Sequence, residues 1–216
     1  MHPALIICIA AVCGAGAGAA CIPLINRFLA KLEAQALPLK ECVWLVVLLS
    51  LIWAAVFGVK GWEANAWLLA LAAAALLSLS WIDWKTYEIP FAYNGFIFAL
   101  GVLAMLFDLT HWYAYVIGFF VISLPLLGLF YVSKGTAIGG GDVKLMAACG
   151  MLLGWKLALL GFVLGCIIGS VVHLGRMKIS GERHMLAMGP YLSIGVLLSA
   201  LFGNAMIAWY LSMIGL

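Results

Sequence analysis

Long apolar runs separated by short polar stretches organise the whole chain. A helix that crosses a membrane needs roughly 20 predominantly apolar residues, and somewhat shorter helices are tolerated. Measured against that length, the sequence predicts eight helices, at residues 3–25, 43–59, 64–82, 91–109, 112–133, 143–154, 157–174 and 189–213. The sixth is short and joins the seventh at Gly154-Trp155-Lys156, so that counts of seven or six crossings stay open.

Composition agrees with a lipid environment. The chain is 67% hydrophobic and only 9% charged, whereas soluble domains carry roughly 25% charged residues. So few charged side chains cannot solvate a globule of 216 residues, and a net charge of +3 gives no case for nucleic acid as a partner. We therefore predict an all-α, polytopic transmembrane helical bundle that forms a single domain over residues 1–216, with membrane lipid around it.

The basic residues orient this bundle, because cytoplasmic loops of membrane proteins are enriched in lysine and arginine. With the N-terminus outside, two basic residues fall in external connections, Lys60 and Lys156. The other nine fall in cytoplasmic connections: Arg27, Lys31, Lys40, Lys85, Lys134, Lys144, Arg176, Lys178 and Arg183. This asymmetry favours the eight-helix topology with the N-terminus outside.

Two of the eight acidic residues stand apart from the rest. Glu33 and Glu41 lie in a polar stretch beside basic residues, and we expect solvated charges there. Asp83 and Asp142 each adjoin a long apolar helix, where an ionisable group is costly and suggests a function. The alternative for each is a helix cap or a carboxylate facing water. The predicted topology places both aspartates at the cytoplasmic face.

Three consecutive glycines precede Asp142: Gly139, Gly140 and Gly141. Glycines permit tight backbone conformations and leave no side chain between the backbone and a bound peptide. Asp142 would then begin a helix, whose dipole favours the ionised carboxylate. We expect the three glycines and Lys144 to contact substrate, although Lys144 also suits a snorkelling lysine that reaches lipid phosphate. A phosphate-binding loop does not fit, since the G-x-x-x-x-G-K-[ST] spacing is absent.

Together these elements resemble the type IV prepilin peptidase family, GxGD aspartic peptidases of the bacterial inner membrane. Asp83 is followed six residues later by Ile89-Pro90, and Gly139-x-Gly141-Asp142 leads into Val143-Lys144-Leu145. Two further segments resemble the family's first and last helices: a glycine-rich run ending at Asn26-Arg27, and Gly189-Pro190-Tyr191-Leu192. The resemblance therefore covers nearly the whole chain.

The resemblance implies that Asp83 and Asp142 are a catalytic dyad. Two neighbouring carboxylates cannot easily both ionise, so they share a proton. The ionised acid activates a water and the protonated acid polarises the scissile carbonyl, so we expect no metal and no cofactor. The implied substrates are type IV prepilins or pseudopilins of pilus assembly or type II secretion. Their basic leader, which ends in a glycine, would be cut at the cytoplasmic face of the inner membrane.

The chain departs from the family in one place. Fuller members carry a cytosolic segment with two CxxC pairs and also N-methylate the new terminus with S-adenosylmethionine. Between Asn26 and Cys42 this chain has one cysteine and no CxxC, so we expect a short, peptidase-only form. The alternative function is a small ion- or proton-coupled transporter that uses embedded carboxylates. The predicted position of both aspartates at one face disfavours it.

Overall fold

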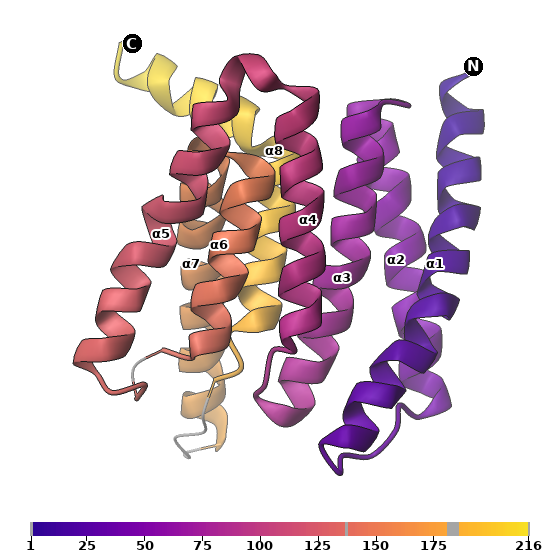
Figure 1. The fold of residues 1–216 in the computed structure, drawn as a ribbon. Helices are drawn as coiled ribbons and strands as arrows, with labels where there is room; N and C mark the ends of the chain where they lie inside the picture. Colours follow the sequence, from indigo (N-terminus) through magenta and orange to yellow (C-terminus); the bar gives the residue numbers. More distant parts are fainter. Residues whose placement is uncertain (1, 137, 181–185, 216) are drawn as a thin grey trace. The chain divides into compact units, whose positions relative to one another are not determined.

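The computed structural model describes residues 2–136, 138–180 and 186–215, and within these ranges it is all-helical. Eight α-helices follow one another, with a short 3₁₀ turn (η1, Leu109–His111) before the fifth (Figure 1). They are α1 (Pro3–Lys31), α2 (Leu39–Lys60), α3 (Ala64–Thr86), α4 (Phe91–Phe107), α5 (Trp112–Val132), α6 (Gly140–Leu153), α7 (Trp155–Ser180) and α8 (Gly189–Met213). The predicted all-α class and the eight helices are confirmed.

Six helices of the described chain are long and apolar enough to cross a membrane: α1, α2, α3, α5 taken together with η1, α7 and α8. The other two are shorter, with 17 residues in α4 and 14 in α6. The chain is therefore a multi-pass membrane protein, while the location of its N-terminus outside the membrane stays a prediction.

Three helices, α1, α3 and α7, continue four to six residues past the ends that were predicted from hydropathy. α1 runs on to Lys31 instead of residue 25, because the polar pair after residue 25 is followed by apolar positions that pack. Leu29 is fully buried, and the ring of Phe28 lies 5.5 Å from that of Tyr93. α3 runs on to Thr86 instead of residue 82, so Asp83 lies in the helix and not in the turn that follows it.

The helices form two compact units, residues 1–96 and 97–216. In the first unit α1, α2 and α3 pack on one another (Figure 1). The hydroxyl of Ser50 in α2 donates to the Ala11 carbonyl in α1 over 2.8 Å, which satisfies a polar group within the apolar interface. At the other side of α2, the rings of Phe57 and Trp67 stack edge to face, with centroids 4.8 Å apart. The single-domain interpretation of the whole chain stays a prediction.

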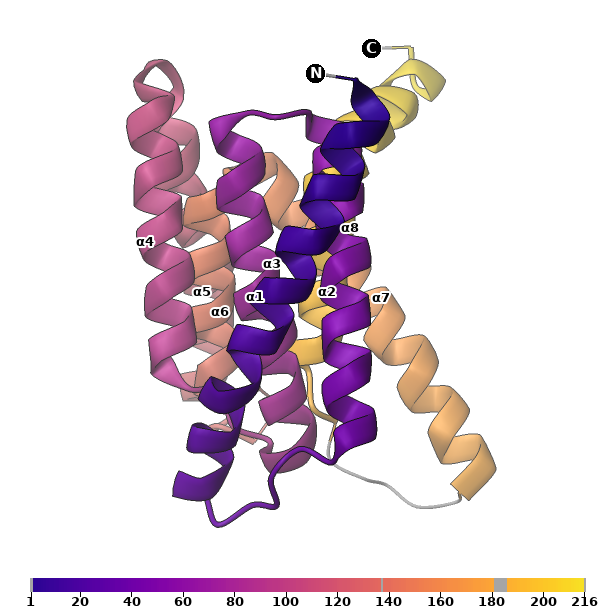
Figure 2. The same ribbon diagram turned by 90° about the vertical axis from the view of Figure 1, so that its right-hand side faces the viewer.

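α6 is the buried helix of the second unit, and it contacts α5, α7 and α8. Its approach to α5 depends on glycine, because a Cβ on Gly150 would overlap the carbonyl group of Gly118. α6 ends at Leu153, Gly154 follows with a positive φ (+75°), and α7 begins at Trp155. Figure 2 shows the C-terminal part of α7 leaning away from α8, where Val171 and Leu174 are 65% and 64% exposed.

Candidate active site

Asp83 lies in the last turn of α3, and its side chain is only 4% exposed. Its carbonyl accepts a hydrogen bond from the backbone N–H of Tyr87 over 2.8 Å, and Tyr87 ends the helix in a left-handed conformation (φ +56°). The Thr86 hydroxyl donates to the Ile82 carbonyl over 2.8 Å and accepts from the N–H of Glu88 over 3.4 Å. These bonds define the turn that follows Asp83.

Asp142 is the third residue of α6 and is 8% exposed, so the predicted helix N-terminus is confirmed. Its N–H donates to the Gly139 carbonyl over 3.1 Å, which closes the first turn. A Cβ on Gly139 would lie 3.1 Å from Oδ2 of Asp142, closer than most real Cβ contacts. Gly139 therefore leaves room for the carboxylate beside the helix N-terminus, where the dipole favours a negative charge.

The loop before α6 is shaped by the end of α5. The N–H of Gly135 donates to the Phe130 carbonyl over 2.8 Å, and Lys134 and Gly135 both take left-handed conformations (φ +52° and +77°). The Phe130 ring also lies 3.6 Å from the position of a Cβ on Gly140. The left-handed turn therefore belongs to Lys134 and Gly135, whereas Gly139, Gly140 and Gly141 have ordinary φ angles.

Each aspartate is followed two residues later by a lysine, Lys85 and Lys144 respectively. Two residues span about 200° around a helix, so each lysine lies on the opposite face from its aspartate. Lys144 is exposed, in agreement with a lysine that reaches the membrane surface. The substrate-binding roles of Lys144 and the three glycines stay predictions.

Burial separates the two aspartates from every other charge that the structure describes. Among the described residues, Asp83 and Asp142 are the only buried Asp, Glu, Lys or Arg side chains. A buried carboxylate is costly unless it is paired or partly neutralised, so such positions favour a function. Asp83 belongs to the first unit and Asp142 to the second, and their action as a dyad stays a prediction.

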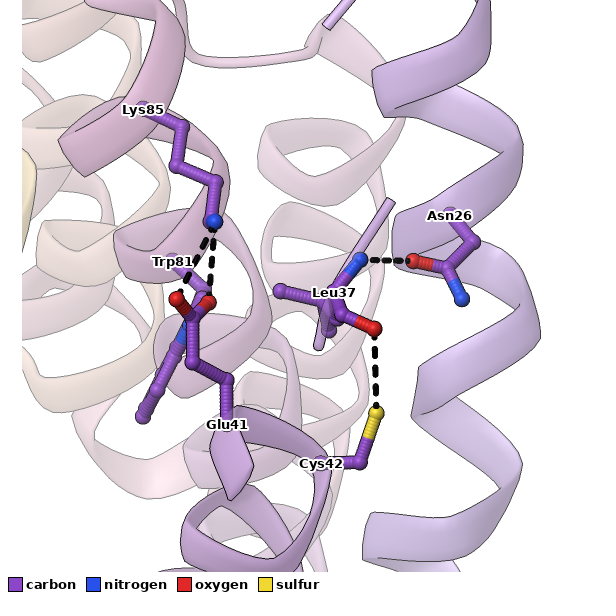
Figure 3. A network of polar contacts seen from close by, with 6 residues as sticks. All are labelled: Asn26, Leu37, Glu41, Cys42, Trp81 and Lys85. Carbon is purple, nitrogen blue, oxygen red and sulfur yellow. Dashed lines mark hydrogen bonds and ion pairs between the residues drawn. The ribbon is translucent and has the colours of Figure 1, made fainter. Parts of the chain in front are cut away.

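One residue of this region was wrongly interpreted from the sequence. Glu41 was expected to be a solvated charge, but it lies in the first turn of α2 and contacts α3 (Figure 3). It accepts a hydrogen bond from the indole N–H of Trp81 over 2.9 Å and forms an ion pair with Lys85 over 3.0 Å. No local signal could have revealed this, because the partners lie 40 and 44 residues further along the chain.

The matched region of the chain runs from within α3 to within α7. Residues 70–174 match the sequence profile of the type IV leader peptidase family. This segment contains Asp83, the Ile89-Pro90 pair, the glycines before α6 and Asp142.

Curated relatives agree with this match. A prepilin leader peptidase/N-methyltransferase of Bacillus subtilis is 32% identical over 125 residues, which cover 54% of this chain and 49% of that protein. A protein of the same name from Aeromonas salmonicida is 29% identical over 167 residues, which cover 71% of this chain and 55% of that protein. One from Burkholderia pseudomallei is 34% identical over 149 residues, which cover 62% of this chain and 47% of that protein.

The chain thus spans about half the length of the relatives that it matches. No solved structure matches it significantly. The family predicted from the two aspartate motifs is confirmed, and it supports the predicted peptidase class. Residues 70–174, which include both buried aspartates, thus match the type IV leader peptidase family.

Proposed function

We propose that this protein is a membrane aspartic endopeptidase that removes the leader peptide from type IV prepilins or pseudopilins. The observation that carries the proposal is the burial of Asp83 and Asp142, both within the segment that matches a leader peptidase family. The substrate class comes from the names of the relatives, which are prepilin leader peptidases. We limit the proposal to the peptidase activity, because the matched profile is that of leader peptidases.

The basic residues support a site at the cytoplasmic face of the inner membrane. In the first unit, contacts of Leu37 with Asn26 and of Glu41 with Lys85 join the end of α1, the start of α2 and the end of α3. Asp83 lies at this end, which carries Arg27, Lys31, Lys40 and Lys85. Basic residues mark cytoplasmic ends in membrane proteins, so this end of the unit suits the cytoplasm.

The second unit repeats the arrangement. Asp142 begins α6 between Lys134 and Lys144, and Figure 1 draws the start of α6 and the end of α7 at the same end of this unit. The last turns of α7 carry Arg176 and Lys178. The same rule therefore assigns Asp142 to the cytoplasmic side, where a leader that precedes a membrane helix would present its scissile bond.

The mechanism follows from two carboxylates that share one proton. The ionised acid accepts a proton from a water, whose oxygen attacks the scissile carbonyl carbon while the protonated acid donates a hydrogen bond to the carbonyl oxygen. A tetrahedral intermediate forms, and its collapse breaks the C–N bond as the leaving amine takes a proton from one of the acids. Such a pair titrates as a unit, so neither aspartate is assigned to a single role.

Gly139 and the residues around it suit an extended substrate. The first turn of α6 lacks side chains at three positions before Asp142, so a peptide backbone could approach the carboxylate closely. We propose that Gly139, Gly140 and Gly141 border the scissile segment and that Lys144 reaches the lipid surface beside it.

Co-expression with a prepilin tests the proposal. We expect the wild-type chain to remove the leader, and Asp83→Asn and Asp142→Asn each to abolish cleavage while the protein still inserts in the membrane. Glu63→Gln is the matched control, since it removes an exposed carboxylate just before α3 and should retain full cleavage. A precursor left uncut by the wild type would refute the proposal, and cleavage by either aspartate variant would remove that residue from the mechanism. The mass of the mature N-terminus reports methylation in the same experiment.

A further inference from the structure

Glu41 lies at the start of α2 and holds two side chains of the helix that carries Asp83. Its carboxylate accepts from Nε1 of Trp81 over 2.9 Å and from Nζ of Lys85 over 3.2 Å. The Glu41 and Lys85 side chains are 32% and 23% exposed, so the pair is partly shielded from solvent. Figure 3 shows both α3 side chains converging on the one carboxylate.

The two partners bracket Asp83 along α3. Trp81 and Lys85 are four residues apart and therefore lie on one helix face, one turn above the other. Asp83 lies midway between them in sequence, about 200° around the axis from Trp81. A carboxylate that binds both Trp81 and Lys85 therefore fixes the rotation of the last turn of α3 about the helix axis. Asp83 is then directed away from α2.

The segment that precedes Glu41 is also held in place by hydrogen bonds. The backbone N–H of Leu37, in the segment before α2, donates to Oδ1 of Asn26 in α1 over 2.9 Å. The thiol of Cys42 donates to the Leu37 carbonyl over 3.7 Å. Figure 3 shows these contacts beside the Glu41 cluster, so Glu41 starts from a segment that is itself tied to α1.

We infer that Glu41 is a positioning residue for Asp83, because it holds Trp81 and Lys85 and so sets the rotation of the last turn of α3. This inference rests on the proposed peptidase function. Helix termini fray more readily than helix interiors, so the contacts of Glu41 add to the hydrogen bonds that close the end of α3.

Simple geometry gives the size of the effect. Side-chain atoms lie about 5 Å from the helix axis, so a rotation of about 20° moves the Asp83 carboxylate by nearly 2 Å. A misplacement of about 1 Å can lower a catalysed rate about 100-fold. Loss of the Glu41 anchor should therefore reduce kcat by about 10- to 100-fold, and KM should change little because the leader-binding groups are untouched.

The first test measures kcat and KM for precursor cleavage by the full-length chain. We expect Glu41→Ala to lower kcat with KM within about 2-fold of wild type. The paired reversal Glu41→Lys with Lys85→Glu should recover only part of the loss, because it restores the ion pair but a lysine cannot accept the hydrogen bond from the Trp81 indole N–H. Glu33→Gln is the matched control, since it alters an exposed acid in the connection just before α2 and should retain wild-type kcat. A lower melting temperature with unchanged kcat per folded molecule would instead reveal a purely structural role and overturn the inference.

A second readout does not depend on peptidase activity. Asp83→Cys is introduced where the six native cysteines are replaced by alanine, and the rate of labelling by a small maleimide is measured. We expect Glu41→Ala to change this rate several-fold and Glu33→Gln to leave it unchanged. An unaltered rate with Glu41→Ala would overturn the positioning role, whereas failure of the wild-type chain to cleave any precursor would count against the proposed function alone.

Discussion

Replacement of Gly150 by alanine should displace the helix that carries Asp142. Gly150 of α6 faces Gly118 of α5, and an added Cβ would overlap the Gly118 carbonyl oxygen and lie 2.5 Å from its carbonyl carbon. Both obstacles are backbone atoms, which cannot rotate away as a side chain could. The two helices must therefore separate.

The required displacement follows from this distance. An ordinary contact begins at 3.4 Å, so relief of the 2.5 Å approach alone needs a shift of about 0.9 Å, and the closer carbonyl oxygen makes this a minimum. Overpacking of this kind lowers the free energy of unfolding by about 1–3 kcal/mol, and the better helix propensity of alanine offsets up to about 1 kcal/mol of that loss. We expect a net loss of about 1–2 kcal/mol, which lowers the melting temperature by about 2–8 °C for a chain of this size. The shift in α6 should also lower the cleavage rate about 10-fold or more.

The assay combines thermal unfolding in detergent with cleavage by the folded fraction. Gly128→Ala is the matched control, because Gly128 lies in α5 with nothing within 4 Å of an added Cβ. It should melt at or slightly above the wild-type temperature and cleave normally. If Gly150→Ala also melted at the wild-type temperature and retained the wild-type rate, the tight packing of α6 on α5 would be incorrect.

Two further changes are informative. Gly139→Ala brings a Cβ to 3.1 Å from Oδ2 of Asp142, so we expect about a 10-fold lower kcat with little change in melting temperature. Gly175→Ala is the control, because an added Cβ there has nothing within 4 Å and should alter neither quantity. Equal cleavage rates for the two variants would remove the steric role of Gly139. Ser199→Ala removes a hydroxyl that donates to the Leu157 carbonyl over 2.6 Å between α8 and α7, and should cost about 0.6 kcal/mol in thermal unfolding; no loss would mean that this bond contributes nothing.

The helices could be predicted from the sequence because an apolar run of membrane length dictates both the helix and its environment. The match was best for residues 189–213, where Gly189-Pro190 marks the start of α8. Hydropathy was less informative about helix ends, since a helix can continue once its apolar run has finished. α1 therefore extends to Lys31 and α7 to Ser180, beyond the ends predicted at 25 and 174.

The site was predictable where its signal was local. The glycines and Asp142 lie within four residues, and their place at a helix N-terminus followed from the motif. The turn after Asp83 begins later than expected, because residues 83–86 complete the last turn of α3. Glu41 was missed because its role depends on Trp81 and Lys85, which only the folded chain brings near. Contacts over such separations leave no periodic pattern in a single sequence.

The central claim is that the Asp83 and Asp142 carboxylates act as one site at the cytoplasmic face. The most direct measurement introduces Asp83→Cys and Asp142→Cys together in the cysteine-free chain and treats membrane vesicles of known orientation with a short bifunctional thiol reagent. We expect the reagent to join the two introduced thiols within one chain, and an impermeant reagent to reach both from the cytoplasmic side. Labelling of the two positions from opposite sides of the membrane, without a cross-link, would contradict the claim that the two carboxylates act as one site.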